Sequence, residues 1–262
     1  MLGIFFLLAW ITILAVLTTT EQQRSRAQLL LPGQVDEEYH GALVRGEHEA
    51  LVRYYRLALS RKLAPYDEQL IRINLACALN GLKEHEQALE ELDRVCLRHL
   101  QPHQIALWLN NRAYTLALLG RPEDALDHLR DAEELLAGDD GLGRDMALLA
   151  CISGTRGIAL LRMGDLDRAE KALQLALQLE GEGGAWKFDP DVEANPARTA
   201  ERWWWLSEVA RARGQEAEAR LRLERAAAHP FTEYGARARQ ALRALGLPTT
   251  NPVPAELPKP LT

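Results

Sequence analysis

The chain of 262 residues lacks an excess of basic residues. It has 31 Lys and Arg against 37 Asp and Glu, which gives a formal charge of -6 at pH 7. Proteins that bind the phosphate backbone of nucleic acid carry the opposite balance, at least on one face. No local run of basic residues compensates for the overall charge. We therefore expect no nucleic acid among the partners.

Cysteine is also scarce. The three cysteines, Cys77, Cys96 and Cys151, are isolated, and no pair has the Cys-x-x-Cys spacing of zinc or redox sites. A secreted, disulfide-bonded protein would be expected to pair its cysteines. We interpret the three residues as small packing side chains in a protein of a reducing compartment.

Catalytic motifs are missing as well. The dipeptides at 48–49 and 85–86 begin like the zinc-protease sequence His-Glu-x-x-His, but Val52 and Leu89 stand where the second histidine is needed. No Gly-x-Ser-x-Gly sequence, Walker-type loop or dinucleotide-binding fingerprint occurs. We therefore expect a protein that is not an enzyme and that has no cofactor and no metal site.

Val and Ile are sparse, whereas Ala, Leu and Arg are frequent. Hydrophobic residues make up 47% of the chain and charged residues 26%. This mixture favours helices over strands and is sufficient for a packed core. The composition predicts an all-α protein.

The first twenty residues contain a long uncharged run, from 2 to 20. As a helix this run is roughly 28 Å long, which is close to the thickness of the hydrocarbon core. A cleaved signal peptide is the alternative, but no Lys or Arg precedes the run and no small-x-small cleavage site follows it. We predict a transmembrane anchor at 1–20, in contact with the lipid bilayer, followed by a linker at 21–32.

The side of the membrane follows from two arginines. Arg24 and Arg26 come directly after the uncharged run. The positive-inside rule then places the rest of the chain in the cytoplasm. A periplasmic or other extracytoplasmic location is the alternative.

A pattern of turn and helix residues recurs five times after the linker. Each copy has a turn residue, an apolar or small residue five positions later, a large residue four positions after that, and a small residue three positions further on. Steps of four and three place these residues on one face of a helix. The copies are Gly46, Leu51, Tyr55, Ala58; Lys83, Ala88, Leu92, Val95; Gly120, Ala125, Leu129, Ala132; Gly164, Ala169, Leu173, Ala176; and Gly214, Ala219, Leu223, Ala226.

Another small residue lies upstream of each of the last four copies, inside a second segment with a helical pattern. Small residues let two helices approach closely, so each unit is predicted to be a helical hairpin. These upstream residues are Ala76, Ala113, Gly157 and Ser207.

The repeated residues resemble the tetratricopeptide repeat (TPR), whose signature is Trp-x2-Leu-Gly-x2-Tyr, then Ala, an aromatic residue and Ala. The fifth copy matches best, with Trp203, Leu206, Ser207 and Ala210 in its first helix, and the match extends over residues 33–230. The resemblance implies an all-α solenoid of about five TPR-like hairpins at 33–245. An amphipathic stretch at 231–245 is predicted to be its capping helix, and the proline-rich tail at 246–262 to be disordered.

In the family, the first helices of the repeats line a concave surface that binds peptides or other proteins. The same positions here give the candidate partner-binding residues, although ordinary hydrogen bonds between helices are an alternative role for the asparagines. We expect Trp203 in the core, and Trp204 and Trp205 near the concave side, either exposed or covered by the insert at 181–195. The candidates are Asn74, Asn111, Tyr114, Ile158, Trp186, Trp204 and Trp205.

These features together predict a membrane-anchored TPR adaptor that assembles proteins at a bacterial-type inner membrane. One alternative is a regulatory or hydrolytic subunit with an unrecognised active site. A structural component of an envelope complex is another.

Overall fold

The computed structural model describes residues 42, 45–137, 145–182 and 195–245, and these residues form helices without any strand. The predicted anchor, linker and tail lie outside the described residues. Ten α-helices and one short 3-10 helix follow one another: α3 (His48–Leu59), α4 (Pro65–Gly81), α5 (His85–Asp93), η1 (Leu97–His99), α6 (Pro102–Leu118), α7 (Pro122–Ala137), α8 (Met146–Met163), α9 (Leu166–Glu182), α10 (Pro196–Ala212), α11 (Glu216–Ala227) and α12 (Glu233–Ala244). The prediction of an all-α helical solenoid is confirmed.

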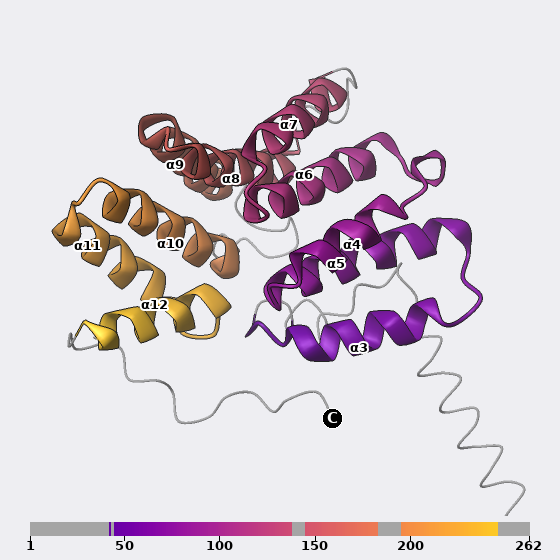
Figure 1. Ribbon diagram of the computed structural model, residues 1–262, viewed down its shortest axis with the longest axis horizontal. Coiled ribbons are helices and arrows are strands. Elements are labelled where there is room, and N and C mark those ends of the chain that lie inside the picture. Colours follow the sequence, from indigo (N-terminus) through magenta and orange to yellow (C-terminus); the bar gives the residue numbers. More distant parts are fainter. Residues whose placement is uncertain (1–41, 43–44, 138–144, 183–194, 246–262) are drawn as a thin grey trace, which may run out of the picture.

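The helices pack as antiparallel hairpins in chain order and curve into an arc (Figure 1). Helices α4 and α5, α6 and α7, α8 and α9, and α10 and α11 form four hairpins. Neighbouring hairpins also touch through their first helices, since α4 contacts α6, α6 contacts α8, and α8 contacts α10. The first helices therefore lie on the inside of the curve. The two ends of the curve, α3 and α12, come close together.

The turn residues of the repeated pattern all adopt the left-handed backbone conformation that ends a helix. Their φ angles are 77° at Gly46, 65° at Lys83, 76° at Gly120, 80° at Gly164 and 72° at Gly214. Glycine reaches this conformation without steric cost, whereas the side chain of Lys83 makes it less favourable. The spacing found in the sequence thus locates every hairpin turn.

The small residues of the pattern are buried where the two helices of each hairpin meet. Ala88, Ala125 and Ala169 have no exposed surface, and Ala219 has 2%. A Cβ added to Gly157 would lie 2.5 Å from Cγ of Leu173 and 3.1 Å from the carbonyl oxygen of Ala169. A larger residue cannot occupy such a position without moving the helices apart.

Prolines and caps define where several helices begin. Pro65, Pro102 and Pro196 each stand in the first turn, where no amide hydrogen is needed. Asn195 accepts hydrogen bonds from two amides at the start of α10, and Thr232 accepts one at the start of α12. These side chains satisfy amides that the first turn of each helix leaves without a backbone partner.

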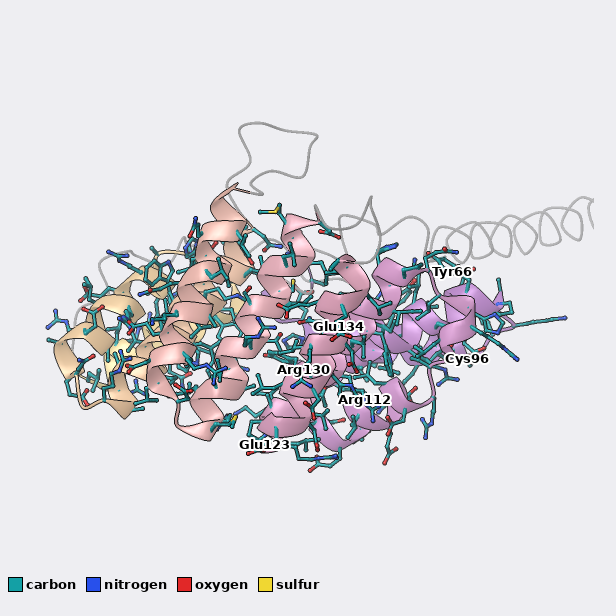
Figure 2. The ribbon with its side chains drawn as sticks, turned by 90° about the horizontal axis from the view of Figure 1, so that it is seen from above. Tyr66, Cys96, Arg112, Glu123, Arg130 and Glu134 are labelled. Atoms are coloured by element: carbon teal, nitrogen blue, oxygen red, sulfur yellow. The ribbon has the colours of Figure 1, made fainter. Side chains whose placement is uncertain are left out.

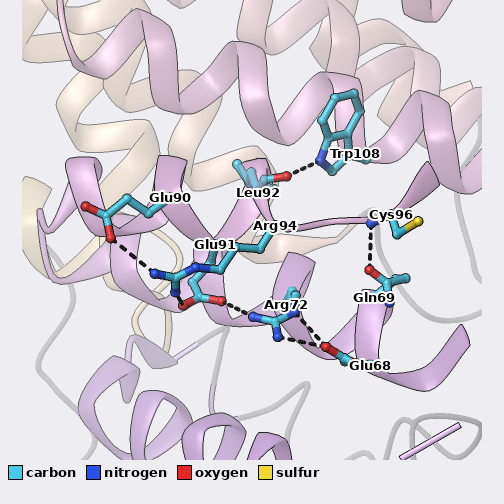
Figure 3. A network of polar contacts seen from close by, with 9 residues as sticks. All are labelled: Glu68, Gln69, Arg72, Glu90, Glu91, Leu92, Arg94, Cys96 and Trp108. Carbon is cyan, nitrogen blue, oxygen red and sulfur yellow. Dashed lines mark hydrogen bonds and ion pairs between the residues drawn. The ribbon is translucent and has the colours of Figure 1, made fainter. Parts of the chain in front are cut away.

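A network of polar contacts joins the first complete hairpin to the next (Figure 3). Arg72 of α4 bonds Glu68 on its own helix and Glu91 on α5, at 2.7 Å and 2.8 Å. Nε1 of Trp108 in α6 donates to the carbonyl oxygen of Leu92 at 2.9 Å. These bonds fix α5 between its neighbours although it is only 9 residues long.

The outer side of the curve carries exposed charges. Figure 2 shows Glu123, Arg130 and Glu134 of α7 on this side, with Arg112 of α6 beside them. Arg112 bonds Asp93 of α5 and donates to Nε2 of His128 at 3.1 Å. This face is a solvated surface of the type expected for the second helices of a solenoid.

Helix α8 is the one described helix that is long and apolar enough to cross a membrane, with 18 residues and a mean hydropathy of 1.4. It lies between α6, α7, α9 and α10, and Ile152, Ile158 and Ala159 on it have no exposed surface. We describe it as the central core helix of the solenoid. It is not the N-terminal segment for which the sequence predicts an anchor.

Candidate partner-binding surface

A chain of polar contacts crosses the inside of the curve. The hydroxyl of Tyr114 on α6 donates to the carboxylate of Glu201 on α10 at 3.2 Å and lies 3.1 Å from the hydroxyl of Tyr234 on α12. The other carboxylate oxygen of Glu201 accepts a bond of 2.8 Å from Arg202. Side chains from three helices far apart in the sequence therefore meet at one point.

Both tyrosine hydroxyls stay protonated there. Burial, the neighbouring Tyr234 and the charge of Glu201 hold the pKa of Tyr114 well above its ordinary value. Burial and Glu201 also raise the pKa of Tyr234. A neutral hydroxyl can donate to a carboxylate and accept from another hydroxyl, so both tyrosines keep a proton to donate at neutral pH.

The ends of the curve meet beside these tyrosines. Nε2 of His48 at the start of α3 lies 2.8 Å from a carboxylate oxygen of Glu233 at the start of α12. Glu233 also bonds Arg237 one turn later on α12. The His48 ring packs against Gly81, where any Cβ would overlap it. Glycine at 81 therefore makes room for the histidine.

The electrostatics of Glu233 favour its charged form. Burial would raise the pKa of this carboxyl group. The hydrogen bond and charge of His48, together with Arg237 and Lys83, outweigh burial and hold the pKa below its ordinary value. The carboxylate is therefore charged and bonded across the closed curve at neutral pH.

A buried ionic pair lies next to the polar chain. The side chains of Arg202 and Glu180 are 4% and 3% exposed, and their nearest charged atoms are 3.9 Å apart. The Arg202 guanidinium lies over Gly154 of α8, where a Cβ would overlap it. Burial raises the pKa of Glu180, and Arg202 and Arg198 oppose that shift. Arg202 is therefore paired mainly with Glu201, at 2.8 Å, and Glu180 lies further from it.

The thiols of the two cysteines on the inner helices stay protonated at neutral pH. Burial raises the pKa of the Cys77 thiol to about 12, and it also raises that of Cys151. A thiol that stays protonated is a poor nucleophile and a poor metal ligand. Cys77, Cys96 and Cys151 are all free, in agreement with their interpretation as packing residues.

Two of the candidate residues lie together on the inner surface. Tyr114 takes part in the polar chain, and the ring of Trp204 lies 6.2 Å from that of Tyr234 between centroids. Asn74 and Asn111 are half-buried on α4 and α6. Partner binding by these four residues stays a prediction, and Trp186 lies outside the described residues.

Ile158 and Trp205 are placed differently from the prediction. Ile158 has no exposed surface and Trp205 has 8%, because both pack in the core formed by α6 to α10. Arg162 covers the ring of Trp205 at 5.9 Å from its centroid, and Nε1 of Trp205 lies 3.4 Å from Glu201. Ile158 and Trp205 are therefore core residues that pack beneath the inner surface and are not exposed on it.

Trp203, expected in the core, is half-buried instead. Arg225 of α11 lies 4.4 Å from the centroid of its ring. Consecutive residues on a helix point about 100° apart, so the three tryptophans cannot all share one face of α10. Trp205 is a buried member of the core formed by α6 to α10, while Trp203 and Trp204 are partly buried and pack against both that core and the apolar cluster of α11 and α12.

Sequence reasoning did not find Glu201, Arg202, Glu180, His48, Glu233 or Tyr234. In the sequence, Arg202 and Glu180 could be recognised only as charged residues on the predicted buried face of a helix. An error of one residue in the helix register would place them on another face. The contacts of His48 and Glu233 depend on how far the whole array curves.

No protein-family model matches the chain, and no curated protein does. Among solved structures, the chain is similar in fold to PlcR of Bacillus thuringiensis, determined in complex with the peptide PapR7 and DNA. The two share 13% identity with a TM-score of 0.59, over 78% of this chain and 70% of PlcR. BtubC (BKLC) from P. vanneervenii matches over 83% of this chain and 81% of its own, with 22% identity and a lower TM-score of 0.47.

The likeness to PlcR supports a helical-repeat fold and corrects one prediction. The acidic composition led us to exclude nucleic acid as a partner, and that exclusion is wrong, because a protein with a similar fold was solved with DNA. Net charge averages over the whole chain, whereas binding depends on the charges of one surface or of one part of a protein.

Proposed function

We propose that the chain is a helical-repeat module that binds a protein or peptide on the inside of its curve. The supporting observation is the convergence of Tyr114, Trp204 and Glu201 with side chains of α12 on that surface. Aromatic rings and hydrogen-bonding groups held by several helices are typical of peptide-binding solenoids. The likeness to PlcR, solved with a peptide, agrees with this role.

The finer proposal is a non-enzymatic TPR adaptor anchored in a membrane. Five left-handed turns at the positions expected for the repeat support the TPR resemblance. The uncharged run at 2–20 supports the anchor, and Arg24 and Arg26 support a cytoplasmic location for the body.

Site-specific cross-linking tests the binding surface. A photoreactive residue in place of Asn74, on the inner helix α4, is expected to give a discrete adduct in cells that express the full chain. The same residue in place of Lys171, exposed on α9, is the matched control and is expected to give none. Equal adducts from both positions would show that the partner binds elsewhere. A nucleic-acid adduct at Asn74 would show that the partner on this surface is nucleic acid and not protein.

Reporter fusions test the location. A fluorescent protein fused at Leu247 should be bright, and alkaline phosphatase fused there should be inactive, because the phosphatase folds only in an oxidising compartment. Active phosphatase with a dark fluorescent fusion would place the body on the other side of the membrane.

A further inference from the structure

The two ends of the curve touch each other, which a row of hairpins does not require. Glu233 of α12 bonds His48 of α3, although 185 residues separate them. The next residue, Tyr234, reaches Tyr114 and lies against Trp204. Helix α12 therefore covers two of the residues that are predicted to bind a partner.

Helix α12 has two faces with different contacts. Ala238 and Leu242 pack on Leu223 and Ala226 of α11, which makes α12 the cap of the C-terminal end. Glu233 and Tyr234 instead contact α3, α6 and α10. Breaking the second set of contacts would separate the two ends of the curve while α12 stays packed on α11.

The contacts of the second face are of an exchangeable kind. Water competes for hydrogen bonds between polar groups, so each such bond adds little net stability compared with apolar burial. A segment that supplies the same groups can replace them. Once uncovered, His48 offers a ring nitrogen to a carboxylate, Tyr114 offers a hydroxyl, and Trp204 offers an aromatic face.

We propose that α12 is a built-in ligand of the inner surface, and that the partner is a peptide in which an acidic residue stands next to an aromatic one. Such a peptide replaces Glu233 and Tyr234. This inference rests on the proposed function and adds its partner class and its regulation. The closed state excludes the peptide. The apparent affinity of the protein for the peptide is therefore the intrinsic affinity multiplied by the fraction of molecules that are open.

Hydrogen exchange of the full chain tests the closed state. Glu233→Lys places a cation near Arg237 and Lys83 and should open the curve, so amides in the first turns of α3 and α12 should exchange at least about tenfold faster. Glu216→Lys, with the same charge change at an exposed site on α11, should leave them unchanged. Tyr234→Ala is a second opening variant, and circular dichroism confirms that each variant is folded. Unchanged exchange in both folded opening variants would overturn the inference.

A peptide with the sequence of residues 229–245 tests the partner class. It should bind the Glu233→Lys protein at least about tenfold more tightly than the wild type, whose surface is occupied. The matched control peptide carries Gln and Ala in place of Glu233 and Tyr234, and should bind neither protein. Faster exchange without preferential peptide binding would overturn the acidic-aromatic partner. The proposed function is tested independently, because cross-linking from Asn74 does not depend on this peptide.

Discussion

The seams inside the hairpins and the contact that closes the curve hold the same molecule together by different physics. The seam between α8 and α9 is apolar, with Gly157 against Leu173 and Ala169. The closing contact is polar and consists mainly of His48 with Glu233 and Tyr114 with Tyr234. Each seam joins helices that are adjacent in the chain, whereas the closing contact joins α12 to α3 and α6, which lie far back in the sequence.

This difference separates stability from adaptability. Close-packed apolar side chains are costly to separate, because even a small change in their packing loses favourable contacts. A few exchangeable hydrogen bonds can open while all the seams stay intact. We therefore expect mutations in the seams to lower the stability of the protein, and mutations in the closing contact to change its shape with a small effect on stability.

The largest effect is expected from a cavity in a seam. Leu173→Ala removes a side chain with no exposed surface and should lower the free energy of unfolding by about 2–5 kcal/mol. Leu175→Ala, two residues later on α9, removes a side chain that is 44% exposed and should have little effect. Urea denaturation of both variants measures the difference, and equal losses would contradict the assigned faces of α9.

Overpacking a seam should cost less. Ala219→Leu inserts a larger side chain at a site on α11 that is 2% exposed, and should lower the free energy of unfolding by about 1–3 kcal/mol. Ala217→Leu on the exposed face of the same helix is the control. Calorimetry should show a lower Tm for the first variant alone, and an unchanged Tm would argue against the close approach of α10 and α11.

The turns should give effects of about 1 kcal/mol in opposite directions. Lys83→Gly removes a side chain from a left-handed position and should stabilise the protein. Gly164→Ala should destabilise it through the backbone alone, since nothing lies within 4 Å of the added Cβ. The two midpoints of urea unfolding should move apart, and a shift of both in one direction would contradict this account.

The smallest effect, below about 1 kcal/mol, is expected from the closing contact. The pKa of Glu233 is lowered in the folded state, so its contribution is present above the pKa of the unfolded chain. It is lost as the pH falls through the lowered folded value. The stability difference between wild type and Glu233→Gln should therefore shrink from pH 7 to pH 3, and a difference that stays constant would show that charge is not involved.

The seams could be predicted from sequence and the closing contact could not. Helical periodicity places Ala88 and Leu92 on one face wherever the helix lies, and a left-handed turn needs a residue such as Gly120 locally. The approach of His48 to Glu233 depends on the sum of small rotations between hairpins. That sum depends on every hairpin in the array, so it cannot be predicted from any one segment of the sequence.

The three consecutive tryptophans show the same limit on a smaller scale. Repeat spacing correctly places Ser207 in the seam and α10 as an inner helix. It does not decide which neighbour each ring faces, because the preceding and following helices compete for the same side of α10. Arg162 and Arg225, which cover two of these rings, come from helices on opposite sides of it.

The bond from Trp108 to the Leu92 carbonyl oxygen gives this protein an internal optical probe. An indole that donates to a fixed carbonyl emits differently from one in water, and this one reports on the junction of α5 and α6 in the N-terminal half. Trp203, Trp204 and Trp205 report on the C-terminal half. With Trp10 and Trp186 replaced by Phe, fluorescence during denaturation would show whether the two halves unfold together or one after the other.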